Sequence, residues 1–235
     1  MVFSYQKFFI FNKIIIDVSK TNKFERDYFE GSESHFSKTL GYDVLVKLNL
    51  WRPKKYKNKI KAFSTFHKTL LDIGCGYGHF LNILKDDFLI HGMDVSNHAI
   101  KVAGSRVDCD YMNGNIEDRI PFNKKFDIIT AISVIEHLES PEIAIRNIHS
   151  HLNEKGLFCL EIPTVSNKIS SFVYKIFFSS DKTHIFIKSV DEIEELIINC
   201  GFKKLAMYCS FFPIFTQLRN WVENFSFVFG IFQKI

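Results

Sequence analysis

The nine residues from Leu70 to Gly78 are the part of the chain whose types and spacing point most directly to ligand binding. They read LLDIGCGYG, an apolar run that passes through Asp72 into glycines at every second position. Glycine has no Cβ, so the backbone can adopt positive φ there, turn sharply out of a strand and come close to a bound molecule. The stretch therefore predicts a small ligand that lies against a glycine-rich loop.

One further acid and two histidines are the other candidates for chemistry. Asp94 closes the apolar run of residues 88–93. Glu136 and His137 follow shortly after the apolar run of residues 126–132. His184 stands in a mixed polar and aromatic segment. Histidine changes its charge near neutral pH, so His137 and His184 are the candidate general bases, with His35 a weaker third.

The elements that must position these residues alternate between strand-like and helix-like runs after residue 66. This alternation predicts a parallel sheet covered by helices on both faces. The expected strands are residues 69–73, 88–93, 109–112, 126–132, 157–162, 202–209 and 225–232. The expected helices begin near Gly78 and after the capping residues Ser96, Ser140 and Ser189. Ligands of such sheets bind beyond the carboxyl ends of the strands, where the glycine loop is expected.

The glycine loop resembles the first motif of class I S-adenosylmethionine (SAM) dependent methyltransferases, and the resemblance extends over about residues 67–210. It implies a Rossmann-like class I methyltransferase fold, of the α/β class, with a mostly parallel seven-stranded sheet, the last strand antiparallel, and helices on both faces. It also implies that SAM is the cofactor. By their position in the motifs, the residues implied to bind SAM are Asp72, Gly74, Gly76, Gly78, Asp94, Val95, Asn115, Ile116 and Ser133.

The resemblance assigns different parts of SAM to different residues. Asp72 is expected to support the loop or the ammonium of the amino-acid tail. Asp94, with Val95 beside it, is expected to accept both ribose hydroxyls, because a carboxylate has two oxygens with which to do so. Asn115 and Ile116 correspond to the segment that contacts the adenine.

The reaction is expected to be methyl transfer to oxygen of a small, sugar-linked or lipid-linked acceptor. Transfer from a sulfonium needs mainly alignment and a dry pocket, but a hydroxyl acceptor also has to lose a proton, which implicates His137 and His184. In the similar ubiquinone-pathway O-methyltransferases, Glu-x-x-Glu-His after the fourth strand holds magnesium. Here Ser133 stands in the first acidic place, and the loss of one carboxylate speaks against a metal ion.

Two other classes of function remain open on the sequence. A nicotinamide-dependent oxidoreductase would use the same kind of sheet, but its G-x-G-x-x-G loop would place glycine where this chain has His79. A catalytically silent, methyltransferase-like binding subunit would keep the cofactor motifs without a productive acceptor pocket.

The chain is expected to divide into a lid and one cofactor-binding domain. Residues 1–66 form the N-terminal lid segment, in which residues 28–31 and 41–42 resemble a lid that excludes water. Residues 67–235 form the SAM-binding domain. Residues 164–188 break the alternation of strands and helices, and we expect them to form an insertion over the active site.

Composition limits the compartment and the partners. The chain has 235 residues, of which 46% are hydrophobic and 24% charged, as in a globular protein. Five cysteines without a C-x-x-C spacing favour a reducing, cytoplasmic location over disulfides or zinc. A net charge of +4 is too small to favour nucleic acid, despite six basic residues between positions 52 and 61. Aromatic runs at 211–215 and 225–232 leave peripheral membrane contact open, although core packing accounts for them as well.

Overall fold

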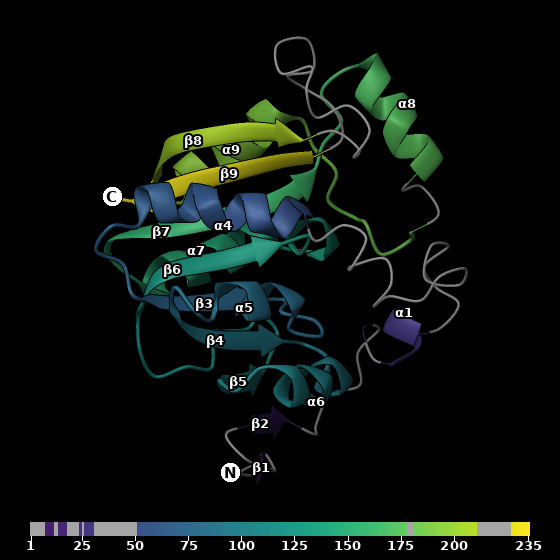
Figure 1. Cartoon of the computed structure of the whole chain (residues 1–235). Helices are drawn as coiled ribbons and strands as arrows, with labels where there is room; N and C mark the ends of the chain where they lie inside the picture. The colour runs from purple at the N-terminus through teal and green to yellow at the C-terminus, as the bar shows by residue number, and fades with distance from the viewer. Residues whose placement is uncertain are drawn as a thin grey trace, which may run out of the picture.

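The structure is a computed structural model that describes residues 8–11, 14–17, 24, 26–30, 51–177, 181–210 and 227–235. A single mixed sheet lies between two layers of helices (Figure 1). The strands are β1 (Phe8–Phe11), β2 (Ile14–Asp17), β3 (Thr69–Ile73), β4 (Leu89–Asp94), β5 (Asp110–Asn113), β6 (Phe126–Ile132), β7 (Leu152–Pro163), β8 (Phe202–Ser210) and β9 (Phe227–Lys234). The helices are α1 (Arg26–Glu30), α4 (Trp51–Phe63), α5 (His79–Leu84), α6 (Asn97–Arg106), the 3-10 turn η1 (Ile135–His137), α7 (Pro141–His151), α8 (Lys168–Phe177) and α9 (Val190–Asn199).

The strand order is β1-β2-β5-β4-β3-β6-β7-β9-β8. From β5 to β7 every neighbouring pair is parallel, whereas β9 runs antiparallel to both β7 and β8. The predicted seven-stranded, mostly parallel sheet is therefore confirmed. Because the order reverses beside β3, the carboxyl ends of β3, β4 and β6 meet at one edge, where such sheets bind ligands.

β7 begins five residues earlier than predicted. It starts at Leu152, directly after α7, and Leu152 pairs with Phe126. Lys155 then adopts φ of 60°, and the register between β6 and β7 shifts before Leu157 pairs with Ile128. A local bulge of this kind leaves no periodic signal, so the sequence indicated a strand only after Gly156.

β1 and β2 extend the sheet beyond β5 and were not predicted. β2 pairs parallel with β5, and β1 pairs antiparallel with β2. Each of the two strands has only four residues. Runs of that length are too short for a periodicity that separates strand from loop.

The core has two halves, one on each face of the sheet. Leu70 belongs to the half covered by α4, α5 and α6, and the next residue, Leu71, belongs to the half covered by α7 and α9 (Figure 1). Successive side chains of a strand point to opposite faces, so a strand buried on both faces reads as an unbroken apolar run. This explains why β3 and β6 match their predicted bounds.

The basic run from Arg52 to Lys61 lies in helix α4. Tyr56 is buried and stacks on Phe229 of β9, with ring centroids 4.2 Å apart and planes 4° apart. Lys57 Nζ lies 2.9 Å from Asp87 Oδ2, and Lys61 pairs with the same carboxylate. These two of the six basic residues thus form ion pairs that hold α4 against the rest of the domain.

Caps fix where two helices begin beside the candidate site. The Ser96 hydroxyl accepts the Ala99 N–H at 3.1 Å, so α6 starts directly after β4, as predicted. Ser140 differs from its predicted role, because its side chain makes no capping bond and Glu117 Oε1 accepts the Ser140 N–H instead. The capping box between Ser189 and Glu192 is confirmed.

The aromatic run near residue 230 is part of the core in the segment that the structure describes. Residues 228, 229, 231 and 232 are buried in β9, while residues 211–226 lie outside the described ranges. Among the helices described, none has the length and apolar character needed to cross a bilayer.

Candidate active site

The glycine loop follows β3 with three residues in the left-handed region. Gly74, Gly76 and Gly78 have φ of 65°, 51° and 73°. A Cβ on Gly74 would lie 2.4 Å from Cγ2 of Val134, and one on Gly78 would lie 3.2 Å from Cβ of Ala103. Both the dihedral angles and the close packing against the β6 exit and α6 therefore require glycine.

The Asp94 carboxylate lies beside this loop and is buried. Its Oδ2 accepts the Gly76 N–H and its Oδ1 accepts the Ser96 N–H, each at 2.8 Å. Each carboxylate oxygen can accept more than one hydrogen bond, so this geometry is compatible with ribose hydroxyls at the same group. The carboxylate is held in place by the loop and by the start of α6.

Asn113 orients the exit of β4, a role that the sequence did not indicate. Its side-chain N–H groups donate to the carbonyl of Asp94 at 3.1 Å and to the carbonyl of Val95 at 2.9 Å. The backbone at the predicted ribose contact is thus fixed from β5. An asparagine at the end of a short strand carries no signal that distinguishes this role from a solvated turn.

Asp72 is buried at the carboxyl end of β3. Burial raises the pKa of its carboxyl to about 7, a hydrogen bond from Thr130 Oγ1 at 2.5 Å opposes this, and the charge of Asp94 raises it further. A positive group close by would favour the ionised carboxylate. The expected contact of Asp72 with the ammonium of SAM stays a prediction.

The structure places Asn115 and Ile116 in a turn after β5. Oδ1 of Asn115 accepts the Glu117 N–H at 3.0 Å, and Ile116 is buried in the core. Asn115 thus stabilises the turn and Ile116 packs in the core, at the edge of the sheet where the adenine contact was expected. Their contact with adenine stays a prediction.

Ser133 is the residue directly after β6, and its backbone is strained. It has φ of 54°, it is exposed, and its N–H donates to the carbonyl of Glu161 at 3.0 Å. Positive φ on a residue with a Cβ costs free energy and is common where a chain is bent to serve a site. The bend turns the chain from β6 into η1.

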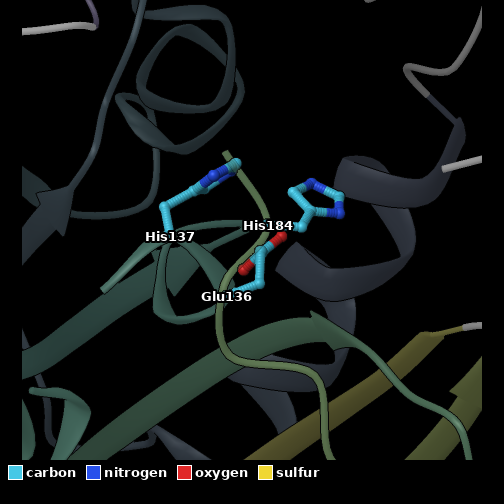
Figure 2. A group of neighbouring side chains, drawn as sticks. All are labelled: Glu136, His137 and His184. Carbon is cyan, nitrogen blue, oxygen red and sulfur yellow. The ribbon is translucent and has the colours of Figure 1, made fainter. Parts of the chain in front are cut away.

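Glu136, His137 and His184 come together at this exit (Figure 2). One potential ligand atom from each lies within 4.8 Å of the others. The two imidazole centroids are 4.8 Å apart. The two candidate histidines, 47 positions apart in sequence, are thus neighbours in space, because the N–H groups of Ile185 and Phe186 both donate to the Glu136 carbonyl at 2.9 Å.

Thr183 and Asp181 set the tautomer of His137. Nδ1 of His137 lies 3.2 Å from the Thr183 carbonyl and 2.9 Å from the Thr183 hydroxyl. That hydroxyl donates to Asp181 Oδ1 at 2.5 Å, and a carbonyl can only accept. Nδ1 must therefore carry the proton, and Nε2 is the nitrogen with the lone pair.

His184 and Glu136 are both in an environment that disfavours charge. Burial lowers the pKa of His184, and Asp181 opposes the shift only partly. Burial raises the pKa of Glu136 to about 8, with a further increase from the charge of Asp181 and an opposing effect of Arg52. Oε2 of Glu136 is buried and has no hydrogen-bond partner among the residues that the structure describes. Tyr174 contacts the cluster from α8, with its hydroxyl 2.9 Å from Nδ1 of His184.

Helix α1 contacts both the glycine loop and His137. Phe29 is buried and stacks on Tyr77, with centroids 4.8 Å apart. The ring of Tyr28 meets His137 edge-on at 6.3 Å, and Phe24 does so at 5.4 Å. Gly31, His35 and the segment 41–42 lie outside the described residues.

The sheet order, the left-handed glycine loop and the acid that closes β4 define a class I methyltransferase fold. A family model described as a methyltransferase domain matches residues 48–206, which is more than half of the chain. The chain belongs to this family.

Curated relatives include ubiquinone biosynthesis O-methyltransferases. The protein of Coxiella burnetii is 28% identical over 135 residues, covering 55% of this chain and 57% of the relative. That of Glaesserella parasuis is 28% identical over 152 residues, covering 58% and 62%. The chain thus matches less than two thirds of the length of these relatives.

A solved structure confirms the fold. The S-adenosylmethionine-dependent methyltransferase from Clostridium acetobutylicum superposes with a TM-score of 0.64 at 13% identity, covering 82% of this chain and 96% of the other. At this identity the likeness concerns the fold alone.

Proposed function

We propose that the protein binds SAM and transfers its methyl group to a hydroxyl oxygen of a small acceptor, free or linked to a sugar or lipid. The observation that carries this proposal is the tautomer of His137, whose Nδ1 is held by Thr183 at the sheet edge that also bears the glycine loop. An imidazole with its lone pair on Nε2 suits the removal of a hydroxyl proton. The names of the relatives, O-methyltransferases of ubiquinone biosynthesis, support the same acceptor atom.

The loop and its surroundings would hold the cofactor. Gly74, Gly76 and Gly78 let the backbone approach it, Asp94 would accept the ribose hydroxyls, and Asp72 would face its positive charge. SAM supplies an activated methyl group on a sulfonium. The protein then contributes alignment and exclusion of water.

When bound, SAM would supply the methyl group: the bond from carbon to sulfur would break as the bond to the acceptor oxygen formed, which would leave a thioether and release the hydroxyl proton. We assign its removal to His137 with the support of His184, which lies in direct ring contact with it. Proton transfer by a positioned side chain contributes on the order of 10² to 10⁴ in rate.

The lid is part of the same proposal. Phe29 on Tyr77 and Tyr28 against His137 would cover the loop and the acceptor side together. Nucleic acid is not among the expected acceptors, because several basic residues of α4 form ion pairs within the domain, for example Lys57 with Asp87.

Calorimetry and a labelling assay test the proposal. We expect SAM and its demethylated product to bind and NAD not to bind, and we expect methyl-tritiated SAM to label a small molecule in a cell extract. His137→Asn should lower the rate of labelling by at least about 10²-fold, while His151→Asn, at the carboxyl end of α7 and partly buried, should not change it. Binding of NAD alone would exclude the function, and label that appears only on protein or nucleic acid would exclude a small acceptor.

A further inference from the structure

Acidic groups stand beside the two histidines of the candidate site. The Glu136 carboxyl group is next to both imidazole rings (Figure 2), and Asp181 Oδ2 lies 3.7 Å from Nε2 of His184. Glu161 is buried at the carboxyl end of β7 and pairs with Arg52 of α4. The positive charge of Arg52 is therefore matched by Glu161, which leaves Glu136 and Asp181 to determine the electrostatics around the two rings.

Glu136 combines burial with an unused oxygen. The residue is 1% exposed, and its Oε2 has no hydrogen-bond partner in the part of the chain that the structure describes. Burial is the main reason that the pKa of its carboxyl is raised; of the neighbouring charges, Asp181 raises this pKa more than Arg52 lowers it. The electrostatic potential at Glu136 is thus negative. A buried acceptor without a donor is costly, and a positively charged donor would satisfy it.

A protonated amine on the acceptor fits this position better than a carboxylate or a phosphate does. An ammonium group has three N–H donors and no acceptor, so it complements an unused carboxyl oxygen. A cation nearby also favours the charged form of a carboxyl group that burial otherwise keeps neutral, whereas an anion would repel both Glu136 and Asp181. The charges around the cluster therefore favour a cationic acceptor.

The short distance between Glu136 and His137 places such an amine beside the hydroxyl that loses its proton. A carboxyl oxygen of Glu136 lies within 4.8 Å of a ring nitrogen of His137. Hydrogen bonds of about 2.9 Å, one from the amine to Glu136 and one from the hydroxyl to His137, span this gap when the two groups are on neighbouring carbon atoms. Both histidines are partly exposed, so the cluster is open on the side of their rings.

We propose that the acceptor is an amino alcohol whose protonated amine, next to the methylated hydroxyl, binds Glu136 with the support of the charge of Asp181. This inference rests on the proposed function, since it names the acceptor class of the same site. A protonated amine has no lone pair, so the hydroxyl oxygen stays the nucleophile. Glu136 then determines specificity, and the removal of the proton stays with His137.

A binding measurement tests the acceptor class without methyl transfer. Protein saturated with the demethylated product of SAM is titrated by calorimetry with a vicinal aminocyclohexanol and with the matching vicinal cyclohexanediol. We expect the amino alcohol to bind at least about tenfold more tightly, because its hydrogen bond joins two charged groups. The titration is repeated without the product, so that a protein that fails to bind the cofactor still gives an answer. An amino alcohol that binds no better than the diol would overturn the proposal.

Glu136→Gln should abolish the preference for the amino alcohol, and Glu142→Gln, at an exposed acid of α7, is the matched control. If far-ultraviolet circular dichroism shows that Glu136→Gln does not fold, Asp181→Asn serves instead, with an expected loss of about two- to fivefold for a partly exposed charge. A preference that survives in the folded variants would also overturn the proposal. Calorimetry with SAM and the labelling assay report on the proposed function separately.

Discussion

At the scale of single residues, Asp94 joins the glycine loop to the predicted ribose site. Its two oxygens each accept a backbone N–H, from Gly76 and from Ser96. Asp94→Asn replaces one acceptor with a donor and should weaken SAM binding by about 1 to 3 kcal/mol, because a buried hydrogen-bonding group is left unsatisfied. Isothermal calorimetry measures the change, and Asp127→Asn, at the other end of the sheet, is the control. Equal affinity in the wild type and Asp94→Asn would remove Asp94 from the site.

Under the proposed function Thr183 is a positioning residue, since it would act on the acceptor through His137. Thr183→Val removes the hydroxyl between Nδ1 of His137 and Asp181, so the fraction of imidazole in the reactive tautomer should fall. We expect kcat to drop about tenfold, because removal of a group that orients a histidine by hydrogen bonding costs at least about that much. The SAM affinity should not change. Thr183→Ser should restore the rate because it keeps the hydroxyl. If Thr183→Ser is as slow as Thr183→Val, packing and not the hydroxyl is responsible.

At the scale of elements, Asp127 ties three strands together at the edge opposite the site. Its Oδ2 accepts the N–H groups of Lys68 and Thr69, each at 3.0 Å, and its Oδ1 accepts from Asn153 at 2.7 Å. Burial alone would raise the pKa of this carboxyl, but these donors lower it to about 2. The ordinary value is about 3.9, so the stabilisation is complete above pH 4 and is lost as the pH falls toward 2.

Asp127→Asn should therefore lower the free energy of unfolding at pH 7 by about 1 to 3 kcal/mol. The difference from the wild type should shrink as the pH falls below 4, because the wild type then loses the same stabilisation. Urea denaturation at pH 7, 5 and 3 measures it. A difference that stays constant over this range would show that the charge of Asp127 is not the cause.

Helix α1 is the element whose function as a lid is most directly testable. Phe29→Ala removes the ring that stacks on Tyr77, while the sheet itself keeps its contacts. Aromatic pairs contribute about 0.5 to 1.5 kcal/mol beyond their area, so dissociation of SAM should become a few-fold to tenfold faster. Stopped-flow fluorescence measures the rate, and Phe66→Ala, at an exposed aromatic in the turn between α4 and β3, is the control. A SAM dissociation rate that does not change would separate α1 from the cofactor site.

The elements show which parts of the structure could be predicted from the sequence. β3, β6 and the caps at Ser96 and Ser189 follow from local patterns of burial and hydrogen bonding, and the structure reproduces them. The glycine loop likewise needs only local information. In contrast, the link between His137 and Thr183 joins residues 46 positions apart, and no local pattern encodes it. The burial of Glu136, whose Oε2 has no partner among the described residues, also depends on tertiary packing and has no local sequence signal.

At the scale of the whole molecule, two separate core halves share one sheet. Phe229 is fully buried and connects β9 to α4 through its stack with Tyr56. Phe229→Ala should lower the free energy of unfolding by about 3 to 5 kcal/mol, the usual cost of deleting a buried aromatic ring. The exposed Phe66 is the control, and Phe66→Ala should change stability by less than about 0.5 kcal/mol. Chemical denaturation distinguishes the two, and similar losses in both variants would contradict this account of the core.

The position of β9 between β7 and β8 has a consequence for assembly. Although β8 precedes β9 in the chain, its ladder partners within the described residues all lie in β9, from Phe202 opposite Lys234 to Ser210 opposite Phe227. A nascent chain that has already formed the parallel strands would thus keep β7 as an open edge and β8 as an undocked segment. Such edges are where chains associate wrongly. Pairing of β9 with β7 and β8 is therefore the step that closes these edges and prevents self-association of this half of the sheet.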